Sequence, residues 1–307
     1  MEAIRIGSDE HKRLFCQTFI DTHDPFKPKE IVWPDLDEES LARLKALPVW
    51  NEAARTEAAT ADKVAALGRA ESDPILGEAI RLQGYEEARH AEVIRLLTRR
   101  YGIVVAPYSP GPEPKNPTWT FLRTGYGECL DSFFAFGLFD IGARSGLFPP
   151  KLIEVFGTIM QEEARHILFI VNWAAFLRAR RPFATRPVFD ARRAWNIAAQ
   201  AFDRVRGVMQ MSSGGKSSQQ GFTLKSHGSF GDFSLRSFLE LCLAENERRF
   251  APYDARLLRP TLVPSTVKLI LQFLPRGKNG RDFGAPAGFG SSTRPTGEGS
   301  RAAPPGA

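Results

Sequence analysis

The sequence predicts an all-α fold in which two helical hairpins form a four-helix bundle and further helices flank it. Between the loose segments of the chain, no alternation of apolar and polar residues is long enough for a strand. Proline, glycine and aspartate residues instead divide the chain into segments of helical length. Two of the breaks are short turns, and the break between them is a long proline-rich connection. This is the layout of two antiparallel helix pairs joined by a crossover.

The N-terminal region, residues 1–40, is predicted to hold one short helix and an extended connection. The helix is expected from Asp9 to Ile20, before several prolines break the chain. Asp35, followed three residues later by Glu38, is a capping-box pattern. We therefore predict that the first bundle helix runs from this cap to about Arg69.

The bundle itself is assigned to residues 41–180. Its second helix follows the turn Ser72-Asp73-Pro74, because proline is favoured in the first turn of a helix. Five prolines between Pro107 and Pro117 mark the long crossover, and Pro149-Pro150 begins the last bundle helix. The second, third and fourth helices are predicted at about residues 75–100, 118–144 and 150–180.

Residues 181–275 are predicted to form additional helices that pack on the bundle. These helices are expected at about residues 188–211, 234–249 and 264–274, with a loop at 212–232. The tail, residues 276–307, is rich in glycine, proline and arginine. It contains too little apolar surface to compensate for its loss of conformational entropy, so we expect it to be disordered.

The composition excludes several classes of protein. The 307 residues are 43% hydrophobic and 25% charged, as in globular proteins that bury a core without disulfides. Three widely spaced cysteines without a CxxC pair exclude a disulfide framework, a zinc ribbon and a rubredoxin-type centre. No signal-peptide pattern and no apolar run of roughly 18 residues occurs. We expect a cytoplasmic protein that does not enter a membrane.

The net charge of +6 gives little support for nucleic acid as a partner. The tail alone has five basic residues against two acidic ones, which is +3 and half of the total. The other basic stretch runs from Arg178 to Arg193. Such a run is usually a solvated face, so a nucleic-acid partner is not expected.

The most informative feature is the pentapeptide Glu-Glu-Ala-Arg-His, which occurs at residues 86–90 and again at 162–166. In each copy the second glutamate and the histidine are three positions apart, so they share one helix face. Apolar residues predominate at helical spacing around both pairs, and an uncompensated carboxylate there would carry a large desolvation cost. Metal coordination compensates for that cost. A hydrogen-bonded Glu–His pair without metal is the alternative interpretation.

The other two bundle helices would each supply one carboxylate. In an antiparallel hairpin, residues equidistant from the turn lie at the same level, which places Glu57 opposite Glu87 and Glu128 opposite Glu163. Asp131 lies one turn beyond Glu128 on the same face. We interpret Asp131 as an acceptor beside a ligand, or as an alternate ligand.

Glu52 competes with Glu57 as the ligand on the first bundle helix. Its neighbours at helical spacing, Arg55 and Lys63, form a polar face, whereas apolar residues follow Glu57 at that spacing. Glu57 is therefore the predicted ligand.

With this pattern the sequence resembles the ferritin-like superfamily of carboxylate-bridged di-iron proteins. The resemblance covers about residues 41–180. It implies that two glutamates bridge the metals and that the remaining ligands are mainly terminal. The bridging residues would be Glu87 and Glu163, and the terminal residues Glu57, His90, Glu128 and His166.

The Glu-Glu-x-Arg-His form of both motifs is most similar to the hydroxylase subunits of bacterial multicomponent monooxygenases. Those subunits are much longer and usually carry aspartate in place of the first glutamate of each motif. The resemblance implies that the first glutamate of each motif accepts a hydrogen bond from the opposite histidine, and that the motif arginines hold these acids. Glu86 would orient His166, Glu162 would orient His90, and Arg89 and Arg165 would hold the two acids.

Four carboxylates and two histidines have a net charge near −4, which two divalent cations neutralise. These ligand types favour iron or manganese over zinc or copper, so two Fe ions, or one Fe and one Mn, are the expected cofactors. The chain has no CxxC, flavin fingerprint or GxGxxG. A separate electron donor, such as a reductase or ferredoxin, is therefore implied.

Aromatic residues concentrate on the third bundle helix. We predict an apolar pocket beside the metals for a small substrate. Its lining residues would be Phe121, Phe136, Phe139, Phe156 and Ile159. Ordinary aromatic core packing is the alternative for each of these residues.

The sequence-based hypothesis is an O₂-dependent di-iron or Mn/Fe oxidoreductase, a hydroxylase or oxidase of a small apolar organic substrate. The alternatives are ferritin- or rubrerythrin-like handling of iron or peroxide, a tRNA hydroxylase-like activity, and a metal-free scaffold. A homo-oligomer is compatible with all of these. Three glutamates of a later helix, Glu240, Glu245 and Glu247, are interpreted as solvated or capping residues rather than ligands.

Overall fold

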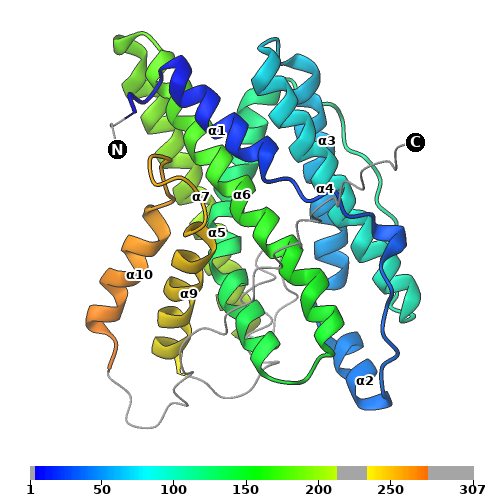
Figure 1. Cartoon of the computed structure of the whole chain (residues 1–307). Helices are drawn as coiled ribbons and strands as arrows, with labels where there is room; N and C mark the ends of the chain where they lie inside the picture. Colours follow the sequence, from blue (N-terminus) through cyan, green and yellow to red (C-terminus); the bar gives the residue numbers. More distant parts are fainter. Residues whose placement is uncertain (1–3, 213–233, 276–307) are drawn as a thin grey trace, which may run out of the picture.

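Helices form every regular element in residues 4–212 and 234–275, the part of the chain that the computed structural model describes (Figure 1). No strand occurs in these residues. The α-helices are α1 (Asp9–Asp21), α2 (Glu38–Ala46), α3 (Trp50–Ala70), α4 (Pro74–Arg100), α5 (Pro117–Arg144), α6 (Pro150–Arg180), α7 (Arg186–Ser212), α9 (Leu235–Phe250) and α10 (Leu262–Phe273). Two short 3₁₀ helices are η1 (Pro28–Glu30) and η2 (Phe183–Thr185).

The punctuation residues begin the helices as the sequence predicts. Asp73 accepts a hydrogen bond from the backbone N–H of Leu76 at the start of α4, and Asn116 accepts one from Trp119 at the start of α5. In both helices the next residue is proline, whose missing N–H costs nothing at this position. All predicted helices except the first of the bundle agree with the structure to within two residues.

The first bundle helix is not continuous, and the prediction of one helix from the Asp35 cap to about Arg69 is wrong. The chain leaves α2 at Leu47 and enters α3 after Val49, because Pro48 between them has no N–H to donate and restricts the residue before it. The cap is Asp37 rather than Asp35. Asp37 accepts from the backbone N–H of Ser40 at 2.7 Å, whereas Asp35 forms an ion pair with Arg100.

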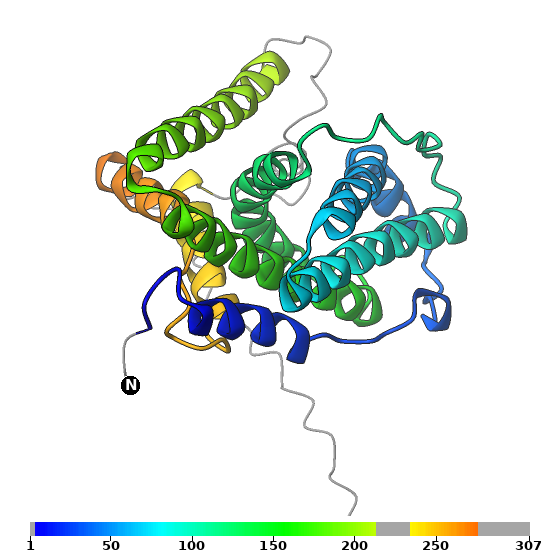
Figure 2. The same ribbon diagram turned by 90° about the horizontal axis from the view of Figure 1, so that it is seen from above.

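Two helical hairpins, α3–α4 and α5–α6, lie side by side, and the remaining helices pack around them (Figures 1 and 2). Helix α1 contacts α4 and α6, whereas α7 and α9 both pack on α5. The connection from α4 to α5 runs around the outside of the hairpins (Figure 2). Each hairpin therefore presents one long face to the other, and the repeated pentapeptides lie on these helices.

The hydrophobic core has a central part between α1, α4, α5 and α6. Close backbone approach is visible at Gly125 of α5, where a Cβ atom would lie 2.5 Å from Cγ2 of Ile170 on α6. Gly127 has its neighbours on α7, with Oε1 of Gln200 at 2.6 Å from the Cβ position. Both glycines therefore permit close helix packing.

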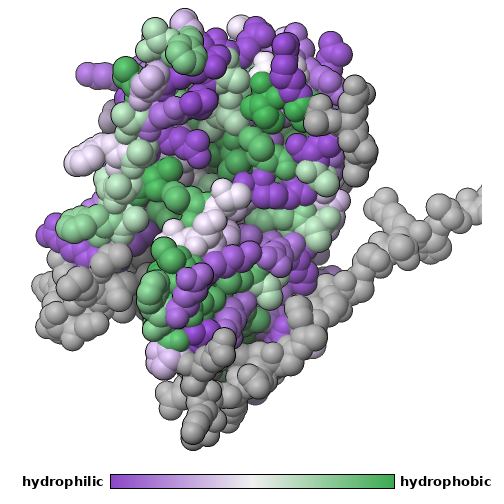
Figure 3. Space-filling model, turned by 90° about the vertical axis from the view of Figure 1, so that its left-hand side faces the viewer, coloured by the Kyte–Doolittle hydropathy of each residue, from purple (hydrophilic) through white to green (hydrophobic). Residues whose placement is uncertain are grey.

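In residues 4–212 and 234–275, no helix combines the length and apolar character needed to cross a membrane. Apolar surface lies in separate patches between hydrophilic residues on the side of the molecule that carries α10 (Figure 3). Leu262, Leu269 and Phe273 of α10 are among the exposed apolar residues.

The three glutamates of α9 differ from one another. Glu240 and Glu247 are exposed and pair with Arg236 and Lys268, as expected for a solvated face. Glu245 is fully buried, and its carboxylate binds Arg248 at 2.6 and 2.8 Å, so the solvated interpretation is wrong for this residue. The predicted loop at 212–232, beyond Ser212, and the tail at 276–307 lie outside the described residues.

Candidate metal centre

The two pentapeptides face each other across the hairpins, with one copy on α4 and the other on α6. The Nδ1 atom of His90 lies 3.5 Å from Oε2 of Glu57 and 3.2 Å from Oε1 of Glu163. Each of these three residues comes from a different helix, and His90 is fully buried. Together with Glu87 they offer four ligand atoms that lie within 4.8 Å of one another, a group that could hold a metal ion.

The second histidine lies next to the same carboxylates. The Nδ1 atom of His166 is 3.0 Å from Oε1 of Glu87 and 3.8 Å from Oε1 of Glu163. The rings of His90 and His166 are stacked, with centroids 5.6 Å apart. Glu87 and Glu163 therefore lie close to both imidazoles. The resemblance implies a bridging role for these two carboxylates.

Glu128 completes the cluster from α5. Burial, and then the charges of Glu87 and Glu163, raise the pKa of its carboxyl group well above the usual value. The structure thus brings together all six predicted ligands: Glu57, Glu87, His90, Glu128, Glu163 and His166.

Several buried atoms of this cluster have no hydrogen-bond partner. Such atoms are rare in folded proteins, because an unpaired buried polar group is costly. The unpartnered ligand atoms are Nδ1 of His90, Nδ1 of His166, Oε1 of Glu163 and both carboxylate oxygens of Glu128. A pair of divalent cations requires ligand atoms whose lone pairs face a common centre and accept no hydrogen bond. These atoms meet that requirement. The residues present therefore fit a two-metal centre.

Behind the cluster, the first glutamate of each pentapeptide binds the opposite histidine. Nε2 of His90 donates to Oε2 of Glu162 at 2.8 Å, and Nε2 of His166 donates to Oε2 of Glu86 at 2.8 Å. These bonds place the ring protons on Nε2 and leave Nδ1 available toward the carboxylates. The crosswise pairing has the form that the resemblance implies.

The two arginines of the repeats bind the same acids, also crosswise. Arg89 donates to Glu162, and Arg165 donates to Glu86. All four side chains are buried. The two guanidinium groups neutralise these two acids, so the charge of the four predicted ligand carboxylates remains to be balanced by cations.

The chain between α1 and η1 also contributes to this network, which the sequence did not predict. Arg165 donates to the carbonyl oxygen of Thr22, and Arg89 donates to the carbonyl of Asp24 at 2.5 Å. Nδ1 of His23 binds Glu86. His23, Glu86 and Glu162 come close enough to hold a metal, but both acids already bind arginine and histidine. This group is therefore a hydrogen-bonded network.

No local pattern around His23 could have identified it. Its partner Glu86 is 63 positions away in the sequence, and the N-terminal connection has no periodicity that indicates its path. Gln83 was also missed. It is buried one turn before Glu87 and donates to Oε1 of that residue at 3.4 Å.

The pKa values of the cluster residues are shifted by burial and by the closeness of several carboxylates. Burial raises the pKa of Glu57 to about 7, although the neighbouring His90 acts in the opposite direction. Burial alone would lower the pKa of His90, but the neighbouring Glu162, Glu163 and Glu57 outweigh it and raise that pKa well above its usual value. Without metal, the centre therefore retains protons.

Asp131 does not join the centre, and its predicted role beside a ligand is wrong. Both of its carboxylate oxygens bind the guanidinium group of Arg204 on α7, with Oδ1 2.6 Å from Nε, and its side chain is 38% exposed. Residues three positions apart on a helix differ in direction by about 60°. This turn is enough for the Asp131 carboxylate to reach Arg204 on α7 and not the cluster.

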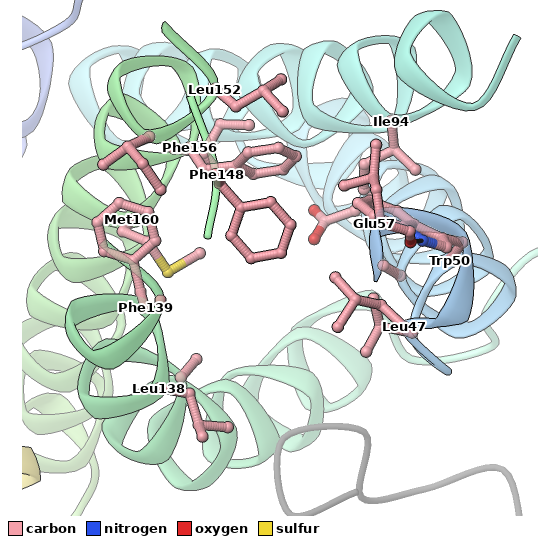
Figure 4. A pocket seen from close by; sticks show the side chains of 17 residues that line it. Leu47, Trp50, Glu57, Ile94, Leu138, Phe139, Phe148, Leu152, Phe156 and Met160 are labelled. Carbon is pink, nitrogen blue, oxygen red and sulfur yellow. Dashed lines mark hydrogen bonds between the residues drawn. The ribbon is translucent and has the colours of Figure 1, made fainter. Parts of the chain in front are cut away.

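An apolar cavity of about 210 Å³ adjoins the centre between α3, α5 and α6. Glu57 is the only charged residue among the 17 described residues that line it. Its carboxylate points into the cavity, toward Phe148 (Figure 4). Phe139, Phe156 and Ile159 line the cavity as predicted. Glu57 thus belongs to both the ligand cluster and the cavity wall.

Phe121 and Phe136 do not line this cavity, so the pocket prediction is wrong for these two residues. Both are fully buried in the central core. Phe121 makes an edge contact with Trp173, and Phe136 lies under the guanidinium group of Arg249 at 5.0 Å. For these two positions the alternative of ordinary core packing applies.

Comparison of the chain with protein-family models, with curated proteins and with solved structures gives no match.

Proposed function

We propose that this protein is a ferritin-like di-iron carboxylate oxidoreductase that uses O₂ to hydroxylate or oxidise a small apolar organic molecule. One observation carries the proposal: a cluster of four carboxylates and two imidazoles adjoins a cavity in which Glu57 is the only charged residue among the described lining residues. The four helices of the two hairpins each contribute to the cluster. Glu-x-x-His pairs on two helices and single glutamates on the other two are the donor arrangement of ferritin-like two-metal proteins.

The centre would hold two Fe ions, or one Fe and one Mn. The ligands would be Glu57, Glu87, His90, Glu128, Glu163 and His166. Bound metals of this kind would supply the redox chemistry by which O₂ is reduced at the centre. A hydroxylation converts a C–H bond and O₂, with two electrons and two protons, into an alcohol and water. The electrons would come from a separate reductase or ferredoxin.

The chain's own residues would orient and protect the centre. Glu162 and Glu86 hold the imidazoles with Nδ1 directed inward, and Arg89 and Arg165 hold those acids in turn. These interactions limit reorganisation of the ligands during reaction. The apolar cavity would place an apolar substrate next to the Glu57 carboxylate.

The size of the cavity limits the substrate. A cavity of roughly 150 Å³ is sufficient for benzene in another protein. The cavity of about 210 Å³ here corresponds to a single ring with a small substituent or to a short alkyl chain. Within residues 4–212 and 234–275, no lining residue carries a positive charge that could pair with an anionic substrate.

The first test is elemental analysis of protein produced in iron- and manganese-replete cells. We expect about two metal ions per chain, and a transient absorption band when the anaerobically reduced protein meets O₂. Glu87→Ala and His166→Ala should lose the metals while retaining most of their helical circular dichroism. Folded wild-type protein that takes up no metal on reconstitution would refute the proposal. Hundreds of iron atoms per assembly would indicate iron storage instead.

Substrate turnover is the second test. Reduced protein should consume O₂ and form a hydroxylated or oxidised product from small aromatic or alkyl compounds. Enlarging side chains in the cavity wall, as in Ala53→Leu, should reduce turnover of the larger compounds first, while the metal content stays at two. Equal loss for all compounds, or loss of metal, would contradict the assignment of the cavity as the substrate site.

A further inference from the structure

Helix α7 presents a row of exposed apolar side chains at intervals of seven residues. Val188, Trp195 and Phe202 are 70%, 74% and 65% exposed. Ala191 and Ala198, which lie between them on the same face, are exposed as well. This alternation of large and small residues at heptad spacing is the pattern of a helix that pairs with another helix. The five residues are called the α7 stripe below.

The opposite face of α7 is fixed by contacts with the rest of the chain. Phe189 is buried, Gln200 donates to the carbonyl oxygen of Arg123 at 2.9 Å, and Arg204 binds Asp131. These contacts determine how the helix is turned about its axis. The α7 stripe therefore faces outward, along the outer edge of the molecule (Figure 2).

We propose that the α7 stripe pairs in antiparallel orientation with the α7 stripe of a second copy of this chain. In such a pair, a two-fold axis passes between residues 196 and 197. Trp195 then lies opposite Ala198 of the second copy, and Phe202 lies opposite Ala191. The two aromatic side chains thus each meet a small one, so the two surfaces interdigitate around Trp195 and Phe202. A parallel pair would instead place Trp195 against Trp195 and leave the alanines facing each other across a gap.

The charged residues beside the stripe support the same partner. Arg192 and Asp203 are exposed, and they lie on opposite sides of the proposed axis, 4.5 and 6.5 residues from it; the guanidinium group of Arg192 also lies over the Trp119 ring of its own chain, 3.8 Å from the centroid. In the antiparallel pair, Arg192 of each copy approaches Asp203 of the other, which gives two complementary contacts of opposite charge. A surface that matches itself in both size and charge favours a second copy over an unrelated partner. This inference does not depend on the proposed function.

The test is the oligomeric state of the full chain, measured by sedimentation over a range of concentrations. We expect a reversible dimer. Trp195→Lys should weaken the dimer at least ~30-fold, because central aromatic residues dominate the energetics of such interfaces. The matched control is Phe273→Lys, which changes an equally exposed aromatic residue on α10 and should leave dimerisation unchanged.

A size swap tests the antiparallel fit itself. Ala198→Trp alone should place two indoles against each other and weaken the dimer, whereas Trp195→Ala combined with Ala198→Trp should restore it. A wild-type chain that remains monomeric at high concentration would overturn the proposal. So would a dimer that Trp195→Lys leaves intact. A monomer whose Trp195 emission is blue-shifted, taken as the difference between the wild-type and Trp195→Phe spectra, would also overturn it, because another part of the chain would then cover the stripe.

Discussion

Glu57 is the residue at which the ligand cluster and the apolar cavity meet. Replacing it with alanine should remove one ligand of the His90 group and open the cavity to water. We expect Glu57→Ala to reduce bound metal from about two ions per chain to one or fewer, as measured by elemental analysis. The matched control is Glu52→Ala on the same helix, where the carboxylate lies 3.5 Å from Arg55. Loss of metal from the Glu52 variant, with none from the Glu57 variant, would reverse the assignment.

His23 makes the environments of the two ligand histidines unequal. Glu86 accepts hydrogen bonds from His166, Arg165 and His23, whereas Glu162, within the described part of the chain, accepts them only from His90 and Arg89. Removing a residue that orients ligands in this way commonly weakens metal affinity by roughly 10- to 100-fold. We expect His23→Ala to weaken the binding of one of the two metals by about tenfold in a Co²⁺ titration.

The control for His23 is His23→Asn, because the asparagine amide can donate from nearly the same position as Nδ1. This variant should bind both metals more tightly than His23→Ala does. Identical titrations for the wild-type protein and the alanine variant would show that His23 does not orient His166 through Glu86.

Metal binding should become tighter as the pH rises through neutrality. Burial raises the pKa of Glu57 to about 7, so below that pH a metal must displace a proton from this carboxyl group. Affinity should therefore fall on acidification, by up to about tenfold per pH unit for each proton displaced. Competition with a chelator between about pH 6 and pH 8 measures this slope. An affinity that does not change over this range would contradict the protonated state of the free cluster.

At the residue scale, the sequence predicted the parts of the centre that repeat. Helical geometry alone predicts that the Glu-x-x-His pairs of the two pentapeptides meet the glutamates that lie equally far from each turn. The structure brings these six side chains together. Two residues show where this reasoning ends. His23 reaches Glu86 from an irregular segment, and Asp131 turns to Arg204 on a helix whose position the sequence does not determine. Both depend on tertiary neighbours.

At the scale of helices, replacement by alanine should have opposite effects on stability at two glycines. Gly125→Ala should destabilise the protein by about 1–3 kcal/mol, because its Cβ would lie 2.5 Å from Ile170 where α5 and α6 touch. Gly157→Ala should instead stabilise it by up to about 1 kcal/mol, since alanine is the better helix former and its nearest neighbour is a ring carbon of Phe139 at 3.6 Å. Urea unfolding of the two variants tests both signs. Equal effects would mean that α5 and α6 do not approach this closely.

The helix boundaries were predictable because proline and capping residues act locally. Asp73 with Pro74 and Asn116 with Pro117 begin α4 and α5 without help from distant parts of the chain. The break at Pro48 was missed because the apolar residues on both sides of it continue one periodic pattern, which the proline ring interrupts in the structure.

For the whole molecule, bound metal should join the two hairpins more firmly. The six proposed ligands come from α3, α4, α5 and α6, and two cations would replace the mutual repulsion of four carboxylates with attraction. We expect the thermal midpoint of the metal-bound protein to exceed that of the chelator-treated protein by several degrees. The effect should vanish in Glu87→Ala. Coincident melting curves with and without two bound ions would show that the centre does not bridge the hairpins.

The all-helical class and the pairing of successive helices follow from periodicity and from the lengths of the connections. The positions of α7, α9 and α10 against α5 do not, because each of these helices has more than one apolar face that could be buried. Their placement depends on side-chain matching over long sequence distances, such as Cys242 of α9 against Gly137 of α5.

The crosswise hydrogen bonds behind the cluster also affect the order in which the chain can fold during its synthesis. Each bond between one pentapeptide and the other joins residues 72 to 80 positions apart, and the bond from Arg165 to Thr22 spans 143. During synthesis, which proceeds from the N-terminus, Glu86 and Arg89 leave the ribosome well before Arg165 and Glu162 exist. Until α6 has emerged, these charged side chains of the first hairpin lack their partners. The proposed metal centre can thus be complete only after α6 has been synthesised.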